Sequence, residues 1–197
     1  MRIVIIGCVD FSAAMLGMLL DHPEAEIVGL VTRNESSANA DFHDLQPFAR
    51  QAGCPVFLST GKDQQTMAAW LRERQADVIY CLGWSLLLTA EVLAIPPLGV
   101  VGYHPAALPQ NRGRHPIIWA LALGLEQTAS SFFLMDEGAD SGDILSQTPV
   151  DIEPTKPKMG PLLREALNRS SSSEMSVLSS IRMACSDHLC HRLLQGG

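Results

Sequence analysis

The sequence predicts an α/β fold built on an open, mostly parallel sheet with helices on both faces. Short runs of apolar, largely β-branched residues alternate with longer stretches of helical periodicity, as in consecutive βαβ units. The runs are apolar at nearly every position, which is typical of strands buried on both faces of a parallel sheet. Ligands of such sheets bind beyond the carboxyl ends of the strands. The expected architecture is therefore Rossmann-like, with its site at that edge.

Six apolar runs predict the strands. The first, RIVII, opens the fold and is broken by Gly7. Another ends at Gly102-Tyr103-His104, so that a histidine stands at the edge where ligands are expected. The predicted strands are residues 2–6, 27–31, 55–58, 78–82, 98–101 and 130–135.

Four stretches between these runs predict helices. In the first, Met15, Leu16, Leu19 and Leu20 share one helical face, and Ser12 is the expected N-cap. In the last, Pro116 is tolerated in the first turn. The predicted helices are residues 12–20, 44–52, 63–75 and 115–124, and the polar segment 33–44 predicts a loop.

The domain boundary is predicted near residue 153. Residues 1–153 form the expected catalytic domain, whereas residues 154–197 form a divergent tail with a serine run and no clear strand. Helices are the only patterns there, at 161–168 and 175–194. A frame change, a truncation and a genuinely divergent end all remain open.

Composition sets limits on the class of protein. The chain is 47% hydrophobic and 18% charged, which is globular, and no apolar run reaches the ~18 residues of a membrane span. The opening MRIVIIGCVDF predicts a buried strand instead of a signal peptide. Five scattered cysteines suit a reducing compartment, so we expect a cytoplasmic protein. The Cys and His residues of the tail have no standard metal spacing, and we expect no metal. These residues are Cys185, His188, Cys190 and His191.

Two segments carry the chemistry. His104 stands at a strand end, and Asp140 follows 36 residues later in the tight loop DEGADSGD (136–143). In adjacent parallel strands the two side chains could meet. A carboxylate beside an imidazole fixes its tautomer, which is how acyl-transfer sites orient their base.

Together the motifs resemble the amino-terminal domain of the 10-formyltetrahydrofolate-dependent formyltransferases. This family includes methionyl-tRNA formyltransferase, glycinamide ribonucleotide transformylase and sugar-nucleotide N-formyltransferases. The resemblance covers residues 1–153 and rests on the order and spacing of His104, Leu108-Pro109, Arg112-Gly113, Pro116, Trp119-Ala120 and Gly138-Ala139-Asp140-Ser141-Gly142-Asp143.

The resemblance implies a role for each part of the site. His104 and Asp140 are the catalytic pair, no metal is needed, and 10-formyltetrahydrofolate is the co-substrate. The residues implied to hold the folate are Gly83, Trp84, Ser85, Leu86, Leu87, Gly138, Ala139 and Asp143. The residues implied to contact the acceptor are Cys8, Phe11, Ser12, Pro109, Arg112 and Arg114.

One position departs from the family pattern. The family has an asparagine two residues before the histidine, and this chain has Gly102. Residues two apart on a strand face the same side, so that asparagine can donate to a developing oxyanion and glycine cannot. Either another donor, such as protonated His104, Asn111 or a backbone N–H, takes the role, or activity is low.

The acceptor is the least determined part of the prediction. The net charge of −7 argues against a nucleic acid, which requires a positive surface. The arginines at 112 and 114 suit a diphosphate or a carboxylate, and we expect the amine of a nucleotide-linked sugar. The alternatives are a methionyl-tRNA formyltransferase-like enzyme, a folate-binding protein without turnover, and hydrolysis of formyltetrahydrofolate. The resemblance also implies homodimers in some branches.

Overall fold

The computed structural model describes residues 1–34 and 41–152. They divide into two compact units. The first comprises residues 1–102 and 135–138, and the second comprises residues 103–134 and those from 139 onward. The two helices and the Cys and His group predicted in the tail lie outside the described residues.

Seven strands form the sheet, in the order β3-β2-β1-β4-β5-β6-β7. Every neighbouring pair from β3 to β5 is parallel, whereas β6 and β7 are antiparallel. The predicted open, mostly parallel sheet is confirmed. The strands are β1 (Arg2–Ile6), β2 (Glu26–Thr32), β3 (Val56–Leu58), β4 (Val78–Cys81), β5 (Val100–His104), β6 (Gln127–Leu134) and β7 (Ile144–Asp151).

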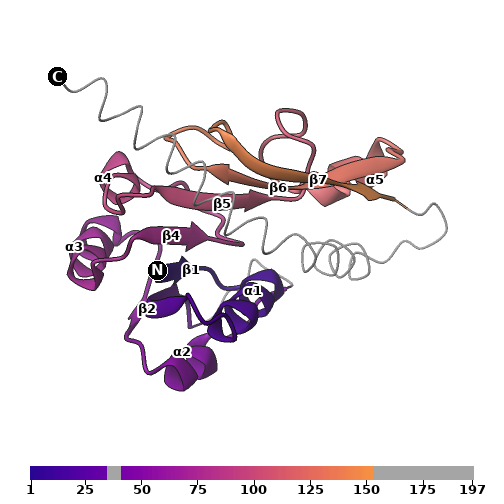
Figure 1. Ribbon diagram of the computed structural model, residues 1–197. Helices are drawn as coiled ribbons and strands as arrows, with labels where there is room; N and C mark the ends of the chain where they lie inside the picture. Colours follow the sequence, from indigo (N-terminus) through magenta and orange to yellow (C-terminus); the bar gives the residue numbers. More distant parts are fainter. Residues whose placement is uncertain (35–40, 153–197) are drawn as a thin grey trace. The chain divides into compact units, whose positions relative to one another are not determined.

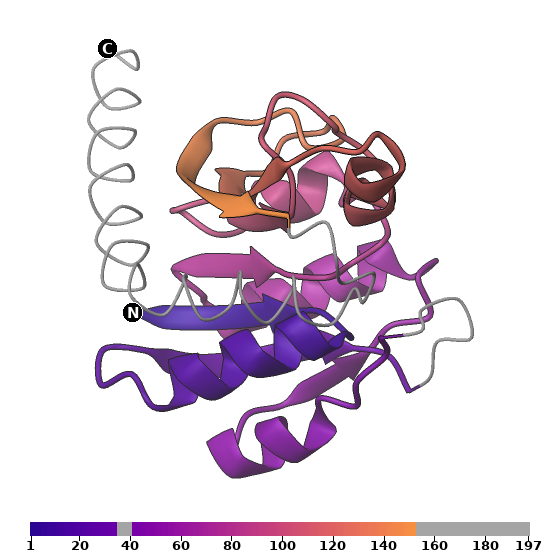
Figure 2. The ribbon, with the colours of Figure 1, turned by 90° about the vertical axis from the view of Figure 1, so that its right-hand side faces the viewer.

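Five helices are present in the described residues: α1 (Asp10–Leu20), α2 (Gln46–Ala52), α3 (Gln64–Arg74), α4 (Ala90–Leu93) and α5 (Pro116–Ala122). In the first unit α1 packs with α2, and α3 packs with α4. The two pairs lie on opposite sides of the strands (Figure 1). In the turned view α1 runs alongside β1 (Figure 2).

The core of the first unit explains why helices lie on both faces of its strands. Val4 and Ile6 on β1 belong to a buried cluster with Met67, Ala68 and Leu71 of α3. Successive side chains of a strand point to opposite faces, and the alternate residues of β1 are also fully buried. Both faces of β1 are therefore covered, as its unbroken apolar run predicted.

Two elements were missed by the sequence prediction. Helix α4 is a single turn of four residues, too short for a periodic pattern. Strand β7 has three consecutive polar residues, Ser146 to Thr148, followed by Pro149. It is the last strand of the sheet, and an edge strand needs neither a continuous apolar run nor every backbone N–H.

The expected N-cap at Ser12 is wrong. Helix α1 begins at Asp10, and Val9 holds the N-cap position. The Ser12 hydroxyl lies inside the first turn, where it accepts a hydrogen bond from the backbone N–H of Val9 at 3.3 Å. It donates to the carbonyl of Leu82 at 2.6 Å. Ser12 therefore caps the helix from its third position by binding back to Val9. Apolar periodicity alone did not show where the helix begins.

The Cys81 thiol gives a prediction on stability and pH. Burial raises the pKa of Cys81 from its ordinary value of 9.0 to about 12, and the neighbouring Cys8 adds to the effect. Above pH 9 the unfolded chain loses this proton while the folded chain keeps it, so stability that is fully present at neutral pH falls between pH 9 and pH 12. We expect the urea unfolding free energy to fall by ~1 kcal/mol per pH unit there. Cys81→Ala should remove most of this slope, and equal slopes in the two proteins would contradict the assignment.

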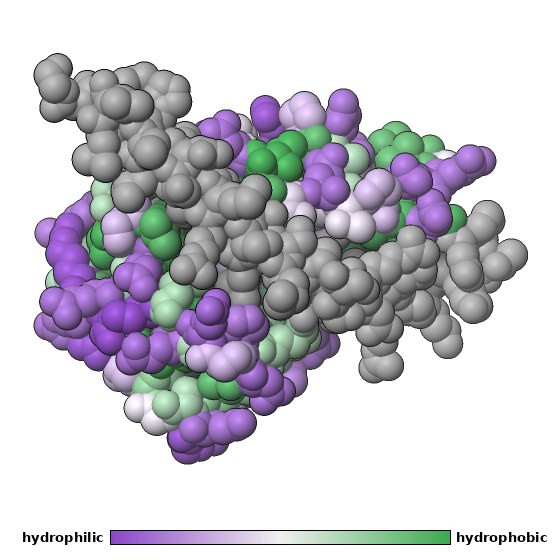
Figure 3. All heavy atoms as spheres, in the orientation of Figure 1, coloured by the Kyte–Doolittle hydropathy of each residue, from purple (hydrophilic) through white to green (hydrophobic). Residues whose placement is uncertain are grey.

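No helix in the described part of the chain is both long and apolar enough to cross a bilayer. In the orientation of Figure 1 the described surface is mostly polar, and apolar atoms reach it near α5 (Figure 3). The exposed apolar side chains of that region are Ile118, Trp119, Leu121 and Leu123.

Candidate functional site

The chain after β5 is held in place by a buried polar network in the second unit. The hydroxyl of Ser131, on β6, is fully buried and donates to the carbonyl of Ala106 at 2.6 Å. The side-chain amide of Gln147, on β7, donates to Ser131 Oγ at 2.9 Å and to the carbonyl of Leu108 at 3.1 Å. The peptide bond between Leu108 and Pro109 is cis. Two carbonyls of this loop are thus fixed by side chains of the antiparallel pair.

His104 and Asp140 come together within this unit, as predicted. His104 is the last residue of β5 and is 5% exposed. Its Nδ1 lies 3.5 Å from Oδ2 of Asp140, and the same carboxylate oxygen accepts a hydrogen bond from the backbone N–H of Gly113 at 2.9 Å. Asp140 stands in the loop between β6 and β7, with a positive φ of 53°. The pair therefore meets because this loop brings Asp140 to His104. The expectation that the two residues stand at the ends of adjacent parallel strands was wrong.

The hydrogen bonds of His104 determine its tautomer. Nε2 lies 2.8 Å from the backbone carbonyl of Asn111. A carbonyl oxygen can only accept, so Nε2 is the protonated nitrogen and donates to it. Nδ1 then faces the Asp140 carboxylate, where it can take up a proton and share it with that group. An imidazole held in this way can receive a proton from an attacking amine and stabilise the resulting cation.

The departure at Gly102 has a defined place. Gly102 lies on β5 opposite Cys81 of β4 and is buried. It is two residues before His104, so a side chain there would face the same side as the imidazole. Of the alternative donors that the sequence suggested, Asn111 contributes its carbonyl to His104. That contact uses an acceptor, and it therefore supplies no donor to an oxyanion.

The 83–87 loop, which follows β4, is anchored at both ends in the first unit. At its start Ser12 donates to the carbonyl of Leu82. At its end Gln64, on α3, donates to the carbonyl of Leu87 at 2.7 Å and accepts from the backbone N–H of Thr89 at 2.9 Å. Between these anchors, the backbone groups of residues 84–86 have no hydrogen bond to any other described residue. The middle of the loop can therefore pair with a ligand.

Gly83 is required by the backbone of this loop. It has a φ of +64°, and a Cβ placed there would overlap Cγ2 of Val9. We expect Gly83→Ala to lower the unfolding free energy by ~2–4 kcal/mol, because left-handed strain and overpacking add. The matched control is Gly53→Ala, which has the same φ of +64° and open space around the new methyl group. Urea unfolding checks both variants, and equal losses would show that the contact with Val9 is irrelevant.

The remaining predicted residues divide by exposure. Cys8, Phe11 and Ser12 are buried in the first unit, at 2%, 3% and 0% exposure, and the Ser12 hydroxyl is already engaged. The residues implied at the acceptor in the second unit, Pro109, Arg112 and Arg114, are exposed, as are Gly138, Ala139 and Asp143. Their assignments to acceptor and folate stay predictions.

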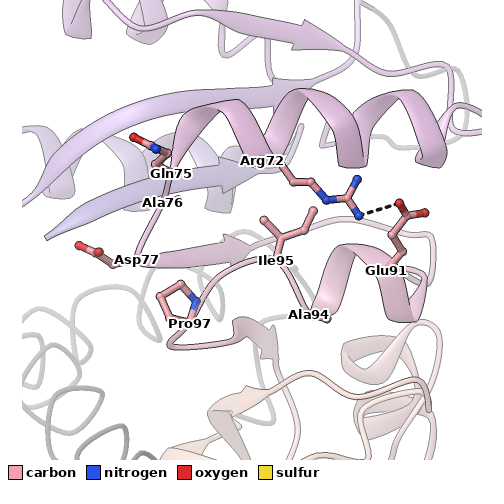
Figure 4. Close-up of a pocket in the computed structure, with 8 residues that line it drawn as sticks. All are labelled: Arg72, Gln75, Ala76, Asp77, Glu91, Ala94, Ile95 and Pro97. Carbon is pink, nitrogen blue, oxygen red and sulfur yellow. Dashed lines mark hydrogen bonds and ion pairs between the residues drawn. The ribbon is translucent and has the colours of Figure 1, made fainter.

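A pocket elsewhere in the first unit lies at the opposite end of the strands. Its volume is about 520 Å³, and it opens beside the amino end of β4 (Figure 4). Nη2 of Arg72 and Oε1 of Glu91 point toward one another across 2.7 Å. Ligands of parallel sheets bind at the carboxyl ends, so we assign no reaction to this pocket. Its lining residues are Arg72, Gln75, Ala76, Asp77, Glu91, Ala94, Ile95 and Pro97.

Sequence reasoning missed the residues that support the site. Ser131 and Gln147 fix the loop after β5, and Gln64 fixes the end of the 83–87 loop. One signal was present, because Ser130 and Ser131 are polar residues at the start of the predicted strand 130–135, whose other residues are apolar. Buried hydroxyls require partners. Nothing in the sequence identified the partners.

The comparisons with known proteins agree with the geometry. The model of the formyl transferase family matches residues 1–170. The chain is 34% identical over 158 residues to a methionyl-tRNA formyltransferase from Synechocystis sp., which covers 77% of this chain and 48% of that protein. This chain therefore belongs to the formyl transferase family. It spans about half the length of the curated relatives it matches.

Solved structures share the fold. A glycinamide ribonucleotide transformylase 1 from Symbiobacterium toebii has a TM-score of 0.74 at 19% identity, covering 94% of this chain and 88% of that one. A formyltetrahydrofolate deformylase from Pseudomonas syringae has a TM-score of 0.73 at 16% identity, covering 94% and 61%. At these identities the likeness establishes the Rossmann-like fold alone.

Proposed function

We propose that this chain transfers a formyl group from 10-formyltetrahydrofolate to a primary amine. The observation that carries the proposal is the His104–Asp140 pair, with Nδ1 and Oδ2 at 3.5 Å in a largely buried position. Family membership supports the chemistry. The amine nitrogen attacks the formyl carbon, and the bond from that carbon to the folate nitrogen breaks. His104 takes the proton that the amine loses and returns it to the departing tetrahydrofolate.

The 83–87 loop is the part that we propose for the pterin ring. The unused backbone donors and acceptors of residues 84–86 match the alternating donors and acceptors of a flat heterocycle. The anchors at Leu82 and Leu87 hold the loop open before any ligand arrives. Binding then requires little ordering, and little affinity is lost to entropy.

We propose methionyl-tRNA as the first acceptor to test, ahead of the nucleotide-linked amino sugar favoured by the sequence. The curated relatives at 34% and 32% identity are methionyl-tRNA formyltransferases. The charge of −7 counts this chain alone, which spans about half of those relatives, so it is no argument against an RNA acceptor. Arg112 and Arg114 are exposed and suit phosphate in either acceptor.

The test measures tetrahydrofolate release from 10-formyltetrahydrofolate with three acceptors: methionyl-tRNA, glycinamide ribonucleotide and a nucleotide-linked amino sugar. Release that depends on one amine, with the formyl group recovered on that amine, supports transfer and names the acceptor. Formate release without any amine would instead support hydrolysis, the reaction for which the deformylase neighbour is named. Binding of tetrahydrofolate with no release under any condition would leave a folate-binding protein and refute the proposal.

A further inference from the structure

Arg33 is close to two further loops of the first unit, so that the loops at the carboxyl ends of β2, β3 and β4 meet at its side chain. It follows β2 directly, and its guanidinium carbon lies 4.8 Å from the centroid of the Trp84 ring, within the range of a cation–π contact. The loop after β3 also reaches this side chain through Gly61. A Cβ built at Gly61 would lie 2.7 Å from Nη2 of Arg33 and 2.9 Å from Cδ1 of Leu86. Because Gly61 has no side chain, the guanidinium of Arg33 can occupy the space beside it.

The charge of Arg33 has no acidic partner among the described residues. Arg2, Arg72 and Arg74 each form an ion pair with a glutamate, whereas Arg33 forms none. Its Nε is buried without a hydrogen bond to any described residue. Removing a charged group from water costs free energy unless another interaction offsets the cost. Arg33 is half-buried, and among the described residues the ring of Trp84 is the partner that its cation faces. We therefore look for the role of Arg33 at Trp84.

We propose that Arg33 is a positioning residue that fixes Trp84 and, through it, the middle of the 83–87 loop. This inference rests on the proposed function, in which residues 84–86 receive the pterin ring. The two ends of the loop are held independently by Ser12 and Gln64. Loss of the guanidinium therefore loosens the middle of the loop and leaves its ends in place. The consequence is weaker folate binding with unchanged chemistry.

The experiment measures tetrahydrofolate affinity by calorimetry in the full chain. We expect Arg33→Met to raise the Kd about tenfold, as the loss of a partly desolvated cation–π contact predicts. Arg33→Lys, which keeps the cation, should recover part of the affinity. The KM for the folate should rise in parallel, while kcat and the KM for the amine stay within about twofold of the wild type. A residue needed only for folding would lower all of these parameters together.

Two controls isolate the contact. Arg74→Met removes a cation at the same 4.8 Å from the Trp70 ring, on α3 and away from the loop, and it should leave the folate Kd unchanged. In a Trp84→Leu background, Arg33→Met should have no further effect, because the partner ring is already gone. Full additivity of the two substitutions would overturn the proposal.

A second ligand separates positioning from direct contact. Tetrahydropteroate lacks the glutamate carboxylates of tetrahydrofolate, and Arg33→Met should weaken both ligands by the same factor. An effect confined to tetrahydrofolate would mean that Arg33 binds the carboxylates, and the positioning role would be wrong. Unchanged affinity of Arg33→Met for a ligand that the wild type binds overturns this inference alone. A wild type that binds neither ligand overturns the proposed function as well.

Discussion

His104→Ala is expected to lower kcat/KM for formyl transfer by about 10²–10⁴, the range for loss of a positioned acid–base group. The imidazole of His104 is positioned to exchange a proton next to Asp140. Its Nε2 donates to the Asn111 carbonyl, and its Nδ1 faces the Asp140 carboxylate. Asp140→Asn should cost a similar factor. An amide in that place presents either a donor or a neutral acceptor to Nδ1, and the tautomer is no longer fixed.

The measurement is tetrahydrofolate release with whichever acceptor supports transfer in the assay proposed above, together with tetrahydrofolate binding and thermal unfolding of each variant. The matched control is His43→Ala. His43 also pairs with an aspartate, Asp10, at 2.9 Å, but these side chains are 41% and 64% exposed, unlike the buried His104. We expect its activity to stay close to that of the wild type. Retention of full activity in His104→Ala would remove the pair from the mechanism.

Gly102→Asn is expected to raise kcat by about 10²-fold, the reverse of the loss seen when one oxyanion donor is removed from an acyl-transfer site. The new amide would stand two residues before His104 on β5 and face the same side as the imidazole. The contact between Asn111 and His104 uses the Asn111 carbonyl, which only accepts, so this contact supplies no donor to the oxyanion.

Gly102→Ala is the control, because it adds a Cβ at the same buried position without a donor. It should leave kcat unchanged or lower it. Rates are compared under saturating folate and amine so that binding does not contribute. Equal rates for the wild type and Gly102→Asn, in a variant that folds and binds folate normally, would show that another donor already stabilises the oxyanion.

The sequence was sufficient for the larger elements. The apolar runs predicted β1 to β6. The pattern was clearest in β1 and β4, because a strand buried on both faces can accept almost no polar residue. The prediction failed at β7, where an edge position tolerates the polar residues and Pro149 that mark a loop elsewhere. It also misplaced Ser12, because a hydroxyl that reaches back one turn has no periodic signature.

The prediction that His104 and Asp140 form a pair came from the sequence alone, since their residue types, order and spacing form a pattern that chance rarely supplies. Their geometry came only from the tertiary structure. A loop with a left-handed Asp140 brings the carboxylate to Nδ1, and Gly113 and Asn111 fix the two partners. The stack of Arg33 on Trp84 is likewise invisible in a sequence that places the two residues far apart. Sequence patterns record burial and local conformation, whereas contacts between distant loops depend on how the strands are ordered in the sheet.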